Sequence, residues 1–505
     1  MTELAALTSW HADWTGLRVA VLGLGVTGFA AADTLVELGA EVIVLASRDD
    51  PERSDVLALL GAGFVEHPLD GPPPKLLEFA PQLIVVSPGF RPDHPILQWA
   101  LENEVAVWGD IELAWRVRDK VRIAEWMCVT GTNGKTTTVQ LATHLIAASG
   151  ARVAAVGNIG VPVLDAVRAP DGFDVLVVEL SSFQLHWINR SPEGAIAPFA
   201  SVCLNLAEDH YDWHGSAQGY RDTKAKVYAN TTFAAIYNKA DLETLRMVED
   251  AEVAEGCRAI GFDLGTPGPS DLGLVGDIVV DRAFHDERHS TAIELTTHGE
   301  LADVGLAAPH SVANVLAASA LARAWGVEPS VIRAAIATFH VDHHRTETVV
   351  LHDEVLWVDD SKATNPHAAA ASLRAYPSVV WIVGGLLKGV DISELVTANA
   401  ERLRAAVLIG IDRDAVRAAF ARHAPDLPVF EVETTETTEV MRIAVGLSAA
   451  VAEPGDTVLL APAAASMDQF TDYADRGRRF AAAVLEIVGG AQDVKLDPPA
   501  SGGDA

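Results

Sequence analysis

The residues with the clearest chemistry lie in a turn between an apolar run and a helical pattern. The run ends at Val129, the turn 130–138 reads Thr-Gly-Thr-Asn-Gly-Lys-Thr-Thr-Thr, and apolar residues recur at helical spacing from 139 to 146. In such a strand–turn–helix unit, the backbone N–H groups of the turn and of the helix N-terminus face phosphate oxygens. Lys135 supplies positive charge and the Thr136 hydroxyl can bind Mg²⁺. The stretch therefore predicts a nucleoside triphosphate site.

The spacing of this loop departs from the general phosphate-loop pattern. The pattern places its first glycine where Val129 stands, whereas the first glycine here is Gly131, so the loop is shorter. An ordinary glycine turn before a core helix stays an alternative. The residues predicted to bind the triphosphate are Gly131, Thr132, Asn133, Gly134, Lys135, Thr136 and Thr137.

Charged side chains follow two further predicted strands. The strand 174–178 ends at Glu179, where a carboxylate is placed to bind the Mg²⁺ of the nucleotide, unless it is a surface acid. The strand 201–206 runs into the cluster 208–214, whose carboxylates and His210 indicate metal or substrate contact; a structural or solvated histidine is the alternative. The helical stretch 220–228 carries Lys224, and its local pattern favours a solvated face.

The first segment begins as a βαβ unit with glycines at dinucleotide-fold spacing. Strand 17–22 is followed by the turn 23–28 (Gly-Leu-Gly-Val-Thr-Gly), a helix closed by Gly39 and a strand at 42–45. An NAD site needs an acid at the end of the second strand, where the sequence has Ala-Ser-Arg, with Asp49 and Asp50 just beyond. Another phosphate-bearing ligand is favoured over NAD, and a purely structural turn is the third possibility.

Another strand of this segment, 82–86, ends in Ser87-Pro88-Gly89. The carboxyl ends of strands are where α/β sheets bind ligands, although a plain connecting turn fits the local sequence equally well.

The whole chain, with 505 residues, has the length of about three α/β domains. Its third segment has predicted strands at 355–358, 379–383, 406–409 and 457–460. A polar cluster follows each of these strands except 406–409. This arrangement predicts a second doubly wound unit. Alternating runs between 250 and 300 predict antiparallel strands without evident chemistry, and 310–325 predicts a core helix. The end of the chain from Gly489 is expected to be disordered.

Composition narrows the class of protein. A formal net charge of −32 argues against nucleic-acid and anionic-membrane partners. The three cysteines have no paired spacing, which indicates buried thiols in a reducing compartment. We see neither a signal-peptide pattern nor a run long enough to span a membrane, so we expect a cytoplasmic protein.

Several motifs in order carry a family resemblance. They are 131–137, Asn158-Ile159-Gly160, Glu179 with the residues to Leu185, Glu208-Asp209-His210, His344-Arg345, 360–365 and Asp468-Gln469-Phe470. From the first glycine turn to about Phe480, the chain resembles the Mur ligase family. The resemblance implies a Rossmann-like UDP-substrate domain (1–117), a central P-loop ATPase with a mostly parallel sheet (118–339), a Rossmann-like domain closing over the nucleotide (340–488) and a tail (489–505).

The resemblance also implies an activity. The motifs are most similar to those of members that add D-glutamate to UDP-N-acetylmuramoyl-L-alanine, with ATP, through an acyl phosphate, in peptidoglycan precursor synthesis. It implies a monomer, two Mg²⁺ ions and a carbamylated Lys224. A Mur-type ligase for a different amino acid and an NAD-dependent dehydrogenase stay alternatives.

Roles for individual residues follow from the same resemblance. The implied catalytic residues are Lys135, Glu179, His210 and Lys224, and the metal ligands are Thr136, Glu179, His210 and Lys224. Asn314, Arg345 and Asp360 would contact the nucleotide, and Val26, Thr27, Ser47, Arg48, Ser87, Gly89, Asn158 and Ser181 the UDP substrate. Lys362, Thr364, Lys388, Ser466 and Tyr473 would bind D-glutamate.

Overall fold

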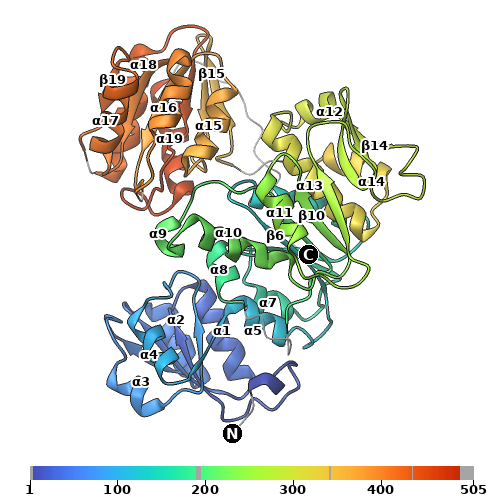
Figure 1. Cartoon of the computed structure of the whole chain (residues 1–505). Coiled ribbons are helices and arrows are strands. Elements are labelled where there is room, and N and C mark those ends of the chain that lie inside the picture. The colour runs from blue at the N-terminus through green and yellow to red at the C-terminus, as the bar shows by residue number, and fades with distance from the viewer. Residues whose placement is uncertain (1–3, 189–194, 341–342, 388, 435, 490–505) are drawn as a thin grey trace. The chain divides into compact units, whose positions relative to one another are not determined.

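The computed structural model describes residues 4–188, 195–340, 343–387, 389–434 and 436–489 (Figure 1). The chain forms two compact units, one of residues 1–207 and 213–340 and the other of 208–212 and 341–505. Two sheets lie in the first unit and one in the second. The predicted tail falls, after Gly489, outside the described residues. The domain boundaries at 117/118 and 339/340 stay predictions.

The first sheet has the order β3-β2-β1-β4-β5 and all its strands are parallel. Its elements are β1 (Arg18–Leu22), α1 (Val26–Glu37), β2 (Glu41–Ala46), α2 (Pro51–Leu60), β3 (Gly63–Glu66), α3 (Pro74–Phe79), β4 (Leu83–Val86), α4 (Pro95–Glu102), β5 (Ala106–Gly109) and α5 (Asp110–Arg116). Residues of α1 and α5 pack in one core cluster and those of α3 and α4 in another, because the alternating side chains of the strands face both ways. The Rossmann-like prediction is confirmed, with the strand order reversing between β1 and β4.

The second sheet has the order β14-β13-β12-β11-β10-β9-β6-β8-β7. Its strands are β6 (Glu125–Thr130), β7 (Val153–Gly157), β8 (Val175–Glu179), β9 (Ala200–Cys203), β10 (Ala234–Asn238), β11 (Arg258–Phe262), β12 (Asp271–Val275), β13 (Ile278–Asp281) and β14 (Ile293–Thr297). Only the pairs β12–β13 and β13–β14 are antiparallel, so the predictions of a mostly parallel sheet and of antiparallel strands between 250 and 300 are confirmed. Its helices are α6 (Lys135–Ala147), α7 (Val163–Val167), α8 (Ser182–His186), α9 (Tyr211–His214), α10 (Ala217–Ala225), α11 (Leu242–Glu249), α12 (His298–Asp303), α13 (Pro309–Trp325) and α14 (Pro329–Ile336).

The third sheet has the order β15-β16-β20-β17-β18-β19 and is parallel except for the edge strand β15. Its elements are β15 (Glu347–His352), β16 (Val355–Asp359), α15 (Pro366–Arg374), β17 (Val379–Gly384), α16 (Ser393–Asn399), β18 (Leu403–Ile409), α17 (Arg413–His423), β19 (Val429–Glu431), α18 (Thr437–Val451), β20 (Thr457–Leu460) and α19 (Tyr473–Ile487). Helices α15 to α17 share one core cluster and α18 and α19 another, which confirms the second doubly wound unit.

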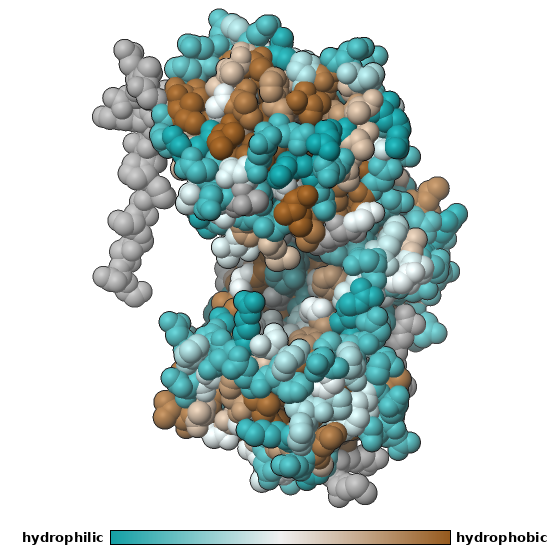
Figure 2. Space-filling model, turned by 90° about the vertical axis from the view of Figure 1, so that its left-hand side faces the viewer, coloured by the Kyte–Doolittle hydropathy of each residue, from teal (hydrophilic) through white to brown (hydrophobic). Residues whose placement is uncertain are grey.

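One face of the molecule can be judged for polarity from Figure 2. Hydrophilic residues predominate on the face drawn in Figure 2, in line with the formal net charge of −32. Within the described part of the chain, we find no helix whose length and hydropathy would let it span a membrane.

Candidate active site

The predicted phosphate loop stands at the carboxyl edge of the second sheet. Strand β6 pairs with β8 so that Val129 faces Glu179, and with β9 so that Thr130 faces Cys203. The loop therefore emerges between the ends of two neighbouring strands. Its helix, α6, begins after Gly134 without a side-chain cap, which leaves backbone N–H groups at the helix start for a ligand.

The loop backbone requires a glycine at position 134. Its φ of 83° is left-handed, and a Cβ there would clash with Oδ1 of Asn314. The close approach brings Asn314, on α13, against the loop predicted to bind the triphosphate.

Hydrogen bonds from the segment after β9 fix the shape of the loop. Asn205 Oδ1 accepts from the Asn133 N–H at 2.9 Å, and Asn205 Nδ2 donates to the Asn133 carbonyl at 3.0 Å. The Thr132 and Tyr220 hydroxyls lie 3.1 Å apart. Sequence reasoning missed Asn205, which lay inside the predicted strand 201–206. Strand β9 ends at Cys203, so Asn205 belongs to the loop after it.

Two lysines converge on this loop. Lys135 Nζ donates to the Gly131 and Thr132 carbonyls, each at 2.9 Å. Lys224 is only 1% exposed, and its Nζ donates to the Gly131 carbonyl at 2.9 Å. The local interpretation of 220–228 as a solvated face was wrong for Lys224. The side of α10 that carries this residue packs against the phosphate loop, so the side chain is buried.

Glu179 is a buried carboxylate with one oxygen left over. The residue is 1% exposed, its Oε1 accepts from Asn158 Nδ2 at 2.9 Å, and its Oε2 has no hydrogen-bond partner in the described structure. The surface-acid alternative was therefore wrong. A buried carboxylate oxygen without a partner is of the kind that Mg²⁺ prefers as a ligand, and Thr136 offers a second buried oxygen.

Two further predicted residues of this region have less defined roles. His210 has a φ of 53° and its Nε2 lies 3.4 Å from Asp209 Oδ2. It belongs to the segment 208–212 of the second compact unit, whereas Thr136, Glu179 and Lys224 belong to the first. Its part in metal binding stays a prediction, as does substrate binding by Asn158.

Six of the predicted UDP-substrate residues lie at the start of α1 and after the ends of β2 and β4, where the first sheet reverses its strand order. The other two, Asn158 and Ser181, follow strands of the second sheet. Helix α1 begins at Val26 after Gly25, without a side-chain cap. At the end of the neighbouring β4, Ser87 Oγ is buried and has no hydrogen-bond partner among the described residues. A cavity of about 560 Å³ opens there, lined by Ser87, Gly89, Phe90, Arg91, Asp93, His94 and Pro95.

The end of β2 does not supply the acid that NAD would need. Ala46 is buried, and Ser47 and Arg48 after it are exposed. Asp50 precedes α2 and pairs with Arg53. Uncapped N–H groups and an unpaired hydroxyl suit a phosphate-bearing ligand better than an NAD ribose.

In the second unit, Asp360 is buried at the end of β16. The residue is 8% exposed, and its carboxylate accepts from the Thr346 N–H at 3.2 Å and from the Ser372 hydroxyl. Burial raises the pKa of Asp360 to about 7, although the hydrogen bond from Ser372 and the positive charge of Arg345 lower it.

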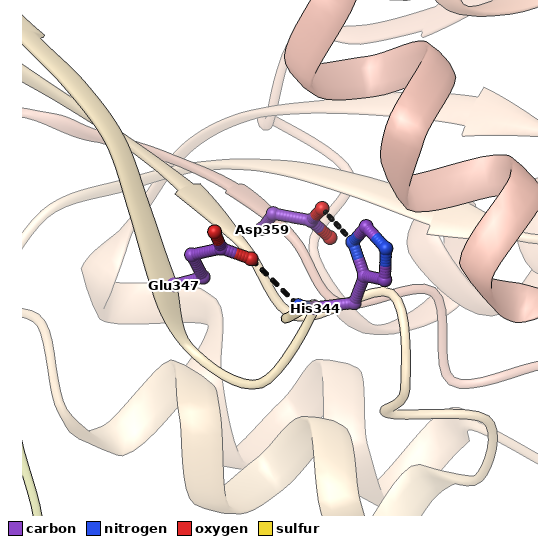
Figure 3. A group of neighbouring side chains, drawn as sticks. All are labelled: His344, Glu347 and Asp359. Carbon is purple, nitrogen blue, oxygen red and sulfur yellow. Dashed lines mark hydrogen bonds and ion pairs between the residues drawn. The ribbon is translucent and has the colours of Figure 1, made fainter. Parts of the chain in front are cut away.

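Next to it, His344, Glu347 and Asp359 form a cluster (Figure 3). His344 Nδ1 and Asp359 Oδ2 lie 2.6 Å apart, and the His344 N–H donates to Glu347 Oε2 at 2.7 Å. The hydrogen bond to Asp359 raises the pKa of His344, although burial opposes it. These two contacts hold the turn that carries Arg345, and one ligand atom of each of the three residues lies within 4.8 Å of the others.

The residues predicted to bind D-glutamate follow β16 and β20. Lys362 Nζ lies 3.6 Å from the centroid of the Tyr473 ring, and the Thr364 N–H donates to the Lys362 carbonyl at 2.8 Å. Ser466 is buried in the loop after β20. The structure thus brings Lys362, Thr364 and Tyr473 together; Lys388 lies outside the described residues.

Arg476, on α19, is a residue of this site that sequence reasoning missed. Its guanidinium is fully buried and donates to the Ser361 hydroxyl at 2.9 Å and to the Ala464 carbonyl at 3.2 Å. It therefore ties the loops after β16 and β20 to each other. No local signal marked it, because an arginine in a helix is usually exposed.

Comparison with known proteins decides the family. Three family models match in order: "Mur ligase MurD-like, N-terminal domain" at 17–109, "Mur ligase middle domain" at 129–322 and "Mur ligase, glutamate ligase domain" at 344–464. A protein of Leifsonia xyli subsp. xyli named UDP-N-acetylmuramoylalanine--D-glutamate ligase is 63% identical, with 99% of each chain covered. This chain belongs to the Mur ligase family.

More distant relatives agree with this membership. A protein of Streptomyces avermitilis with the same name is 50% identical over 94% of this chain and 98% of its own. The crystal structure of the UDP-N-acetylmuramate-alanine ligase MurC from Thermotoga maritima has a TM-score of 0.54 at 18% identity, with 93% of this chain and 99% of that chain covered. At that identity the likeness supports the Mur ligase fold, with its three α/β domains.

Proposed function

We propose that this Mur ligase joins D-glutamate to UDP-N-acetylmuramoyl-L-alanine with consumption of ATP, in peptidoglycan precursor synthesis. The observation that carries the chemistry is the arrangement of Lys135, Lys224 and the free oxygen of Glu179 around one phosphate loop. The choice of substrates rests on the name shared by the relatives that are 63% and 50% identical.

The first step activates a carboxylate. An oxygen of the alanine carboxylate attacks the γ-phosphorus of ATP, the new P–O bond replaces the bond to ADP, and an acyl phosphate forms. Both reactants are anions, so the site must supply positive charge. Lys135 meets this need from the first turn of α6, next to N–H groups that point toward the phosphates.

Mg²⁺ fits the residues at hand. Thr136 and Glu179 offer a hydroxyl and a carboxylate oxygen, and the unpaired Oε2 of Glu179 is an oxygen that only an ion, a water or a ligand would satisfy. Bound there, the ion would neutralise charge that develops on the phosphate oxygens. A second ion, with His210 as a ligand, belongs to the same proposal.

Carbamylation of Lys224 belongs to it as well. A lysine ammonium is a donor and cannot bind Mg²⁺, whereas a carbamate presents anionic oxygens. Support comes from the burial of Lys224 beside the loop rather than on a solvated face.

The second step forms the amide. The amine of D-glutamate attacks the acyl carbon, a C–N bond forms, phosphate leaves with the electrons of the C–O bond, and the amine loses a proton. We propose Lys362, Thr364, Lys388, Ser466 and Tyr473 as the D-glutamate residues, in which the lysines provide charge for a dicarboxylate. We propose Arg345, Asn314 and Asp360 as nucleotide contacts.

The UDP substrate would bind at the first sheet. The uncapped start of α1, at Val26 and Thr27, suits its diphosphate, and Ser47, Arg48, Ser87 and Gly89 surround that point from the neighbouring strand ends. Asn158 and Ser181 would contact the sugar end of the same substrate. We further expect a cytoplasmic monomer, and the free cysteines 128, 203 and 257 fit a reducing compartment.

An amino-acid panel tests the proposal. Phosphate release would be measured with UDP-N-acetylmuramoyl-L-alanine, ATP and Mg²⁺, in the presence of D-glutamate, L-lysine, D-alanine or L-alanine. We expect turnover with D-glutamate alone, and none in the Lys135→Ala variant. Turnover with another amino acid would reassign the enzyme within the family, and full activity of Lys135→Ala would sink the role of the loop.

A further inference from the structure

Asp110 is a buried acid that the proposed reaction does not use. It is the first residue of α5, it is 6% exposed, and its Oδ2 accepts from Gln184 Nε2 at 3.0 Å. Its Oδ1 is buried without a hydrogen-bond partner within the described ranges. A half-paired carboxylate in the interior costs stability, so its presence calls for a reason other than packing.

The bond to Asp110 fixes the direction of the Gln184 side chain. An ionised carboxylate only accepts hydrogen bonds, so the amide nitrogen of Gln184 must face Asp110. The amide oxygen then faces Ser181, whose N–H donates to it at 3.1 Å, while the Gln184 N–H donates to Ser181 Oγ at 3.1 Å. These two bonds are the capping box that starts α8.

Only Leu180 and Ser181 separate Glu179 from the start of α8. Between them, Leu180 is held to the phosphate-loop strand, since its N–H donates to the Val129 carbonyl at 2.9 Å and its carbonyl accepts from Thr130 Oγ1 at 2.8 Å. The orientation of Ser181 is therefore set on one side by β6 and on the other by Gln184 and Asp110.

Asp110 comes from the first sheet, whereas Ser181 and Glu179 belong to the second. The segments after β5 and α8 come close together, because a Cβ on Gly109 would lie 2.8 Å from Cβ of Trp187, which follows α8. Through Gln184, the end of β5 thus touches α8, the helix whose N-cap is Ser181 and which follows the strand that ends at Glu179.

We propose that Asp110 is a positioning residue, which orients the Gln184 amide so that Ser181 and the start of α8 are held for the UDP-linked substrate. The inference rests on the proposed function. It predicts that substitution of Asp110 raises the KM for the UDP-linked substrate. The KM values for ATP and D-glutamate should change little, because the substitution displaces only the first turn of α8.

The charge state of Asp110 is compatible with this role. Burial raises its pKa to about 6, although the hydrogen bond from Gln184 lowers it, so the group is ionised above neutral pH. The charged neighbours on α5, Glu112 and Arg116, pair with each other at 2.8 Å, and burial lowers the pKa of His186 on α8 to about 4, which leaves it neutral.

A donor–acceptor swap tests the proposal. In Gln184→Glu two carboxylates face each other, and we expect the KM for the UDP substrate to rise about 10–100-fold at pH 8, with partial recovery toward pH 6 as the pair takes up a proton. Asp110→Asn alone, whose amide no longer fixes the direction of Gln184, should raise the same KM about 5–10-fold. In the double variant, the new amide at position 110 would donate to the new carboxylate at position 184, which still accepts from Ser181, so the KM should return to within about 3-fold of wild type.

Two outcomes of these measurements would contradict the proposal. If the double variant is no better than the product of the two single effects, or if Asp110→Asn lowers the melting temperature but leaves every KM unchanged, the role is structural and the proposal fails. The Asp110→Asn result stands even where Gln184→Glu does not fold. A wild-type enzyme without D-glutamate-dependent turnover would instead refute the proposed function.

A matched control exists elsewhere in the chain. Thr297 and Glu300 form the capping box of α12, so Glu300→Gln makes the reverse exchange at the same helix position. We expect it to leave the KM for the UDP substrate unchanged.

Discussion

Lys224 is the residue whose surroundings define the site most sharply. A buried ammonium is stable only with hydrogen-bond acceptors, and here these include the Gly131 carbonyl at 2.9 Å and Thr130 Oγ1 at 3.4 Å, with the Tyr220 ring 4.8 Å away. The side chain thus lies on the inner side of the phosphate loop. The carbamate proposed above would form on this buried nitrogen.

If Lys224 acts as a carbamate, a carboxylic acid should replace its end group. We expect Lys224→Ala to lose at least about 100-fold in kcat, because a ligand of the charged transition state is gone. Acetate or propionate should restore part of that activity in a saturable manner, measured as ADP formation. The absence of rescue at every concentration would count against carbamylation.

Lys226 provides the control for this rescue. It lies two positions further along the same stretch, and its Nζ donates to the His186 and Ile188 carbonyls at 2.7 and 3.2 Å. Lys226→Ala should therefore respond to neither acid, whatever its own activity.

Asp360 makes stability depend on pH with a defined sign. Its pKa is about 7 in the folded protein, above the ordinary value of 3.8, so folding favours the protonated form. The stability that this proton adds is present at pH 4 and is lost as the pH rises through 7. Relative to Asp360→Asn, the wild type should thus lose about 3 kcal/mol between pH 4 and pH 8. Calorimetric melting of both proteins across this range measures the difference.

Asp456 should show the opposite sign. Although burial opposes it, hydrogen bonds from Ser378 and the Glu453 N–H, together with Arg404, hold the pKa of Asp456 below its usual range. Its contribution to stability is therefore present at neutral pH and is lost on acidification. A parallel pH trend for Asp360→Asn and Asp456→Asn would mean that general acid effects, not these sites, dominate.

At the scale of elements, the start of α6 offers a test of loop geometry. Gly134→Ala adds a Cβ that clashes with Asn314 Oδ1 and strains a φ of 83°. We expect the Kd for ATP, from calorimetric titration, to rise at least about 10-fold with a loss of stability of about 1–3 kcal/mol. Gly150→Ala is the matched control, because it has a φ of 89° with no atom within 4 Å of the new Cβ. Equal ATP affinities for the two variants would show that the clash is irrelevant.

Sequence patterns located most elements of the sheets because buried parallel strands are continuous apolar runs. The strands β1, β6, β8 and β17 lie close to where those runs predicted them. Other strands were not predicted, among them β3, β10, β15 and β19. The edge strand β15 is only partly buried, and β19 has three residues, so neither leaves a clear pattern.

The candidate site was predictable where it depends on strand ends and not where it depends on packing between elements. Glu179 and the loop 131–137 follow directly from their strands. Asn205, Asp110 and Arg476 act through partners that are 72, 74 and 115 residues away in the chain. Such pairings follow from sheet order and helix packing, which a local pattern does not contain.

For the whole molecule, the excess of acid sets a general constraint. With a formal net charge of −32, repulsion between carboxylates destabilises the folded chain at low ionic strength. Arg168 counters it where α1 meets α7, with its guanidinium 2.6 Å from Asp33, 3.1 Å from Glu37 and 3.1 Å from Asp165. One cation there separates three carboxylates and links the first sheet to the second.

Arg168→Gln should therefore destabilise the protein in a salt-dependent manner. At low ionic strength we expect a loss of about 1–2 kcal/mol, since the side chain is largely shielded from solvent. Its removal takes this cation from Asp33 and Asp165 and leaves Glu37 with Lys120. At about 0.5 M KCl, screening should reduce the loss to less than about half, as read from melting temperatures at both salt levels. Arg417→Gln on α17 removes a more exposed pair with Glu431 and should leave the melting temperature nearly unchanged at either salt level. A loss for Arg168→Gln that is independent of salt would mean that Arg168 acts through packing, and that acidic repulsion does not limit the contact between the two sheets.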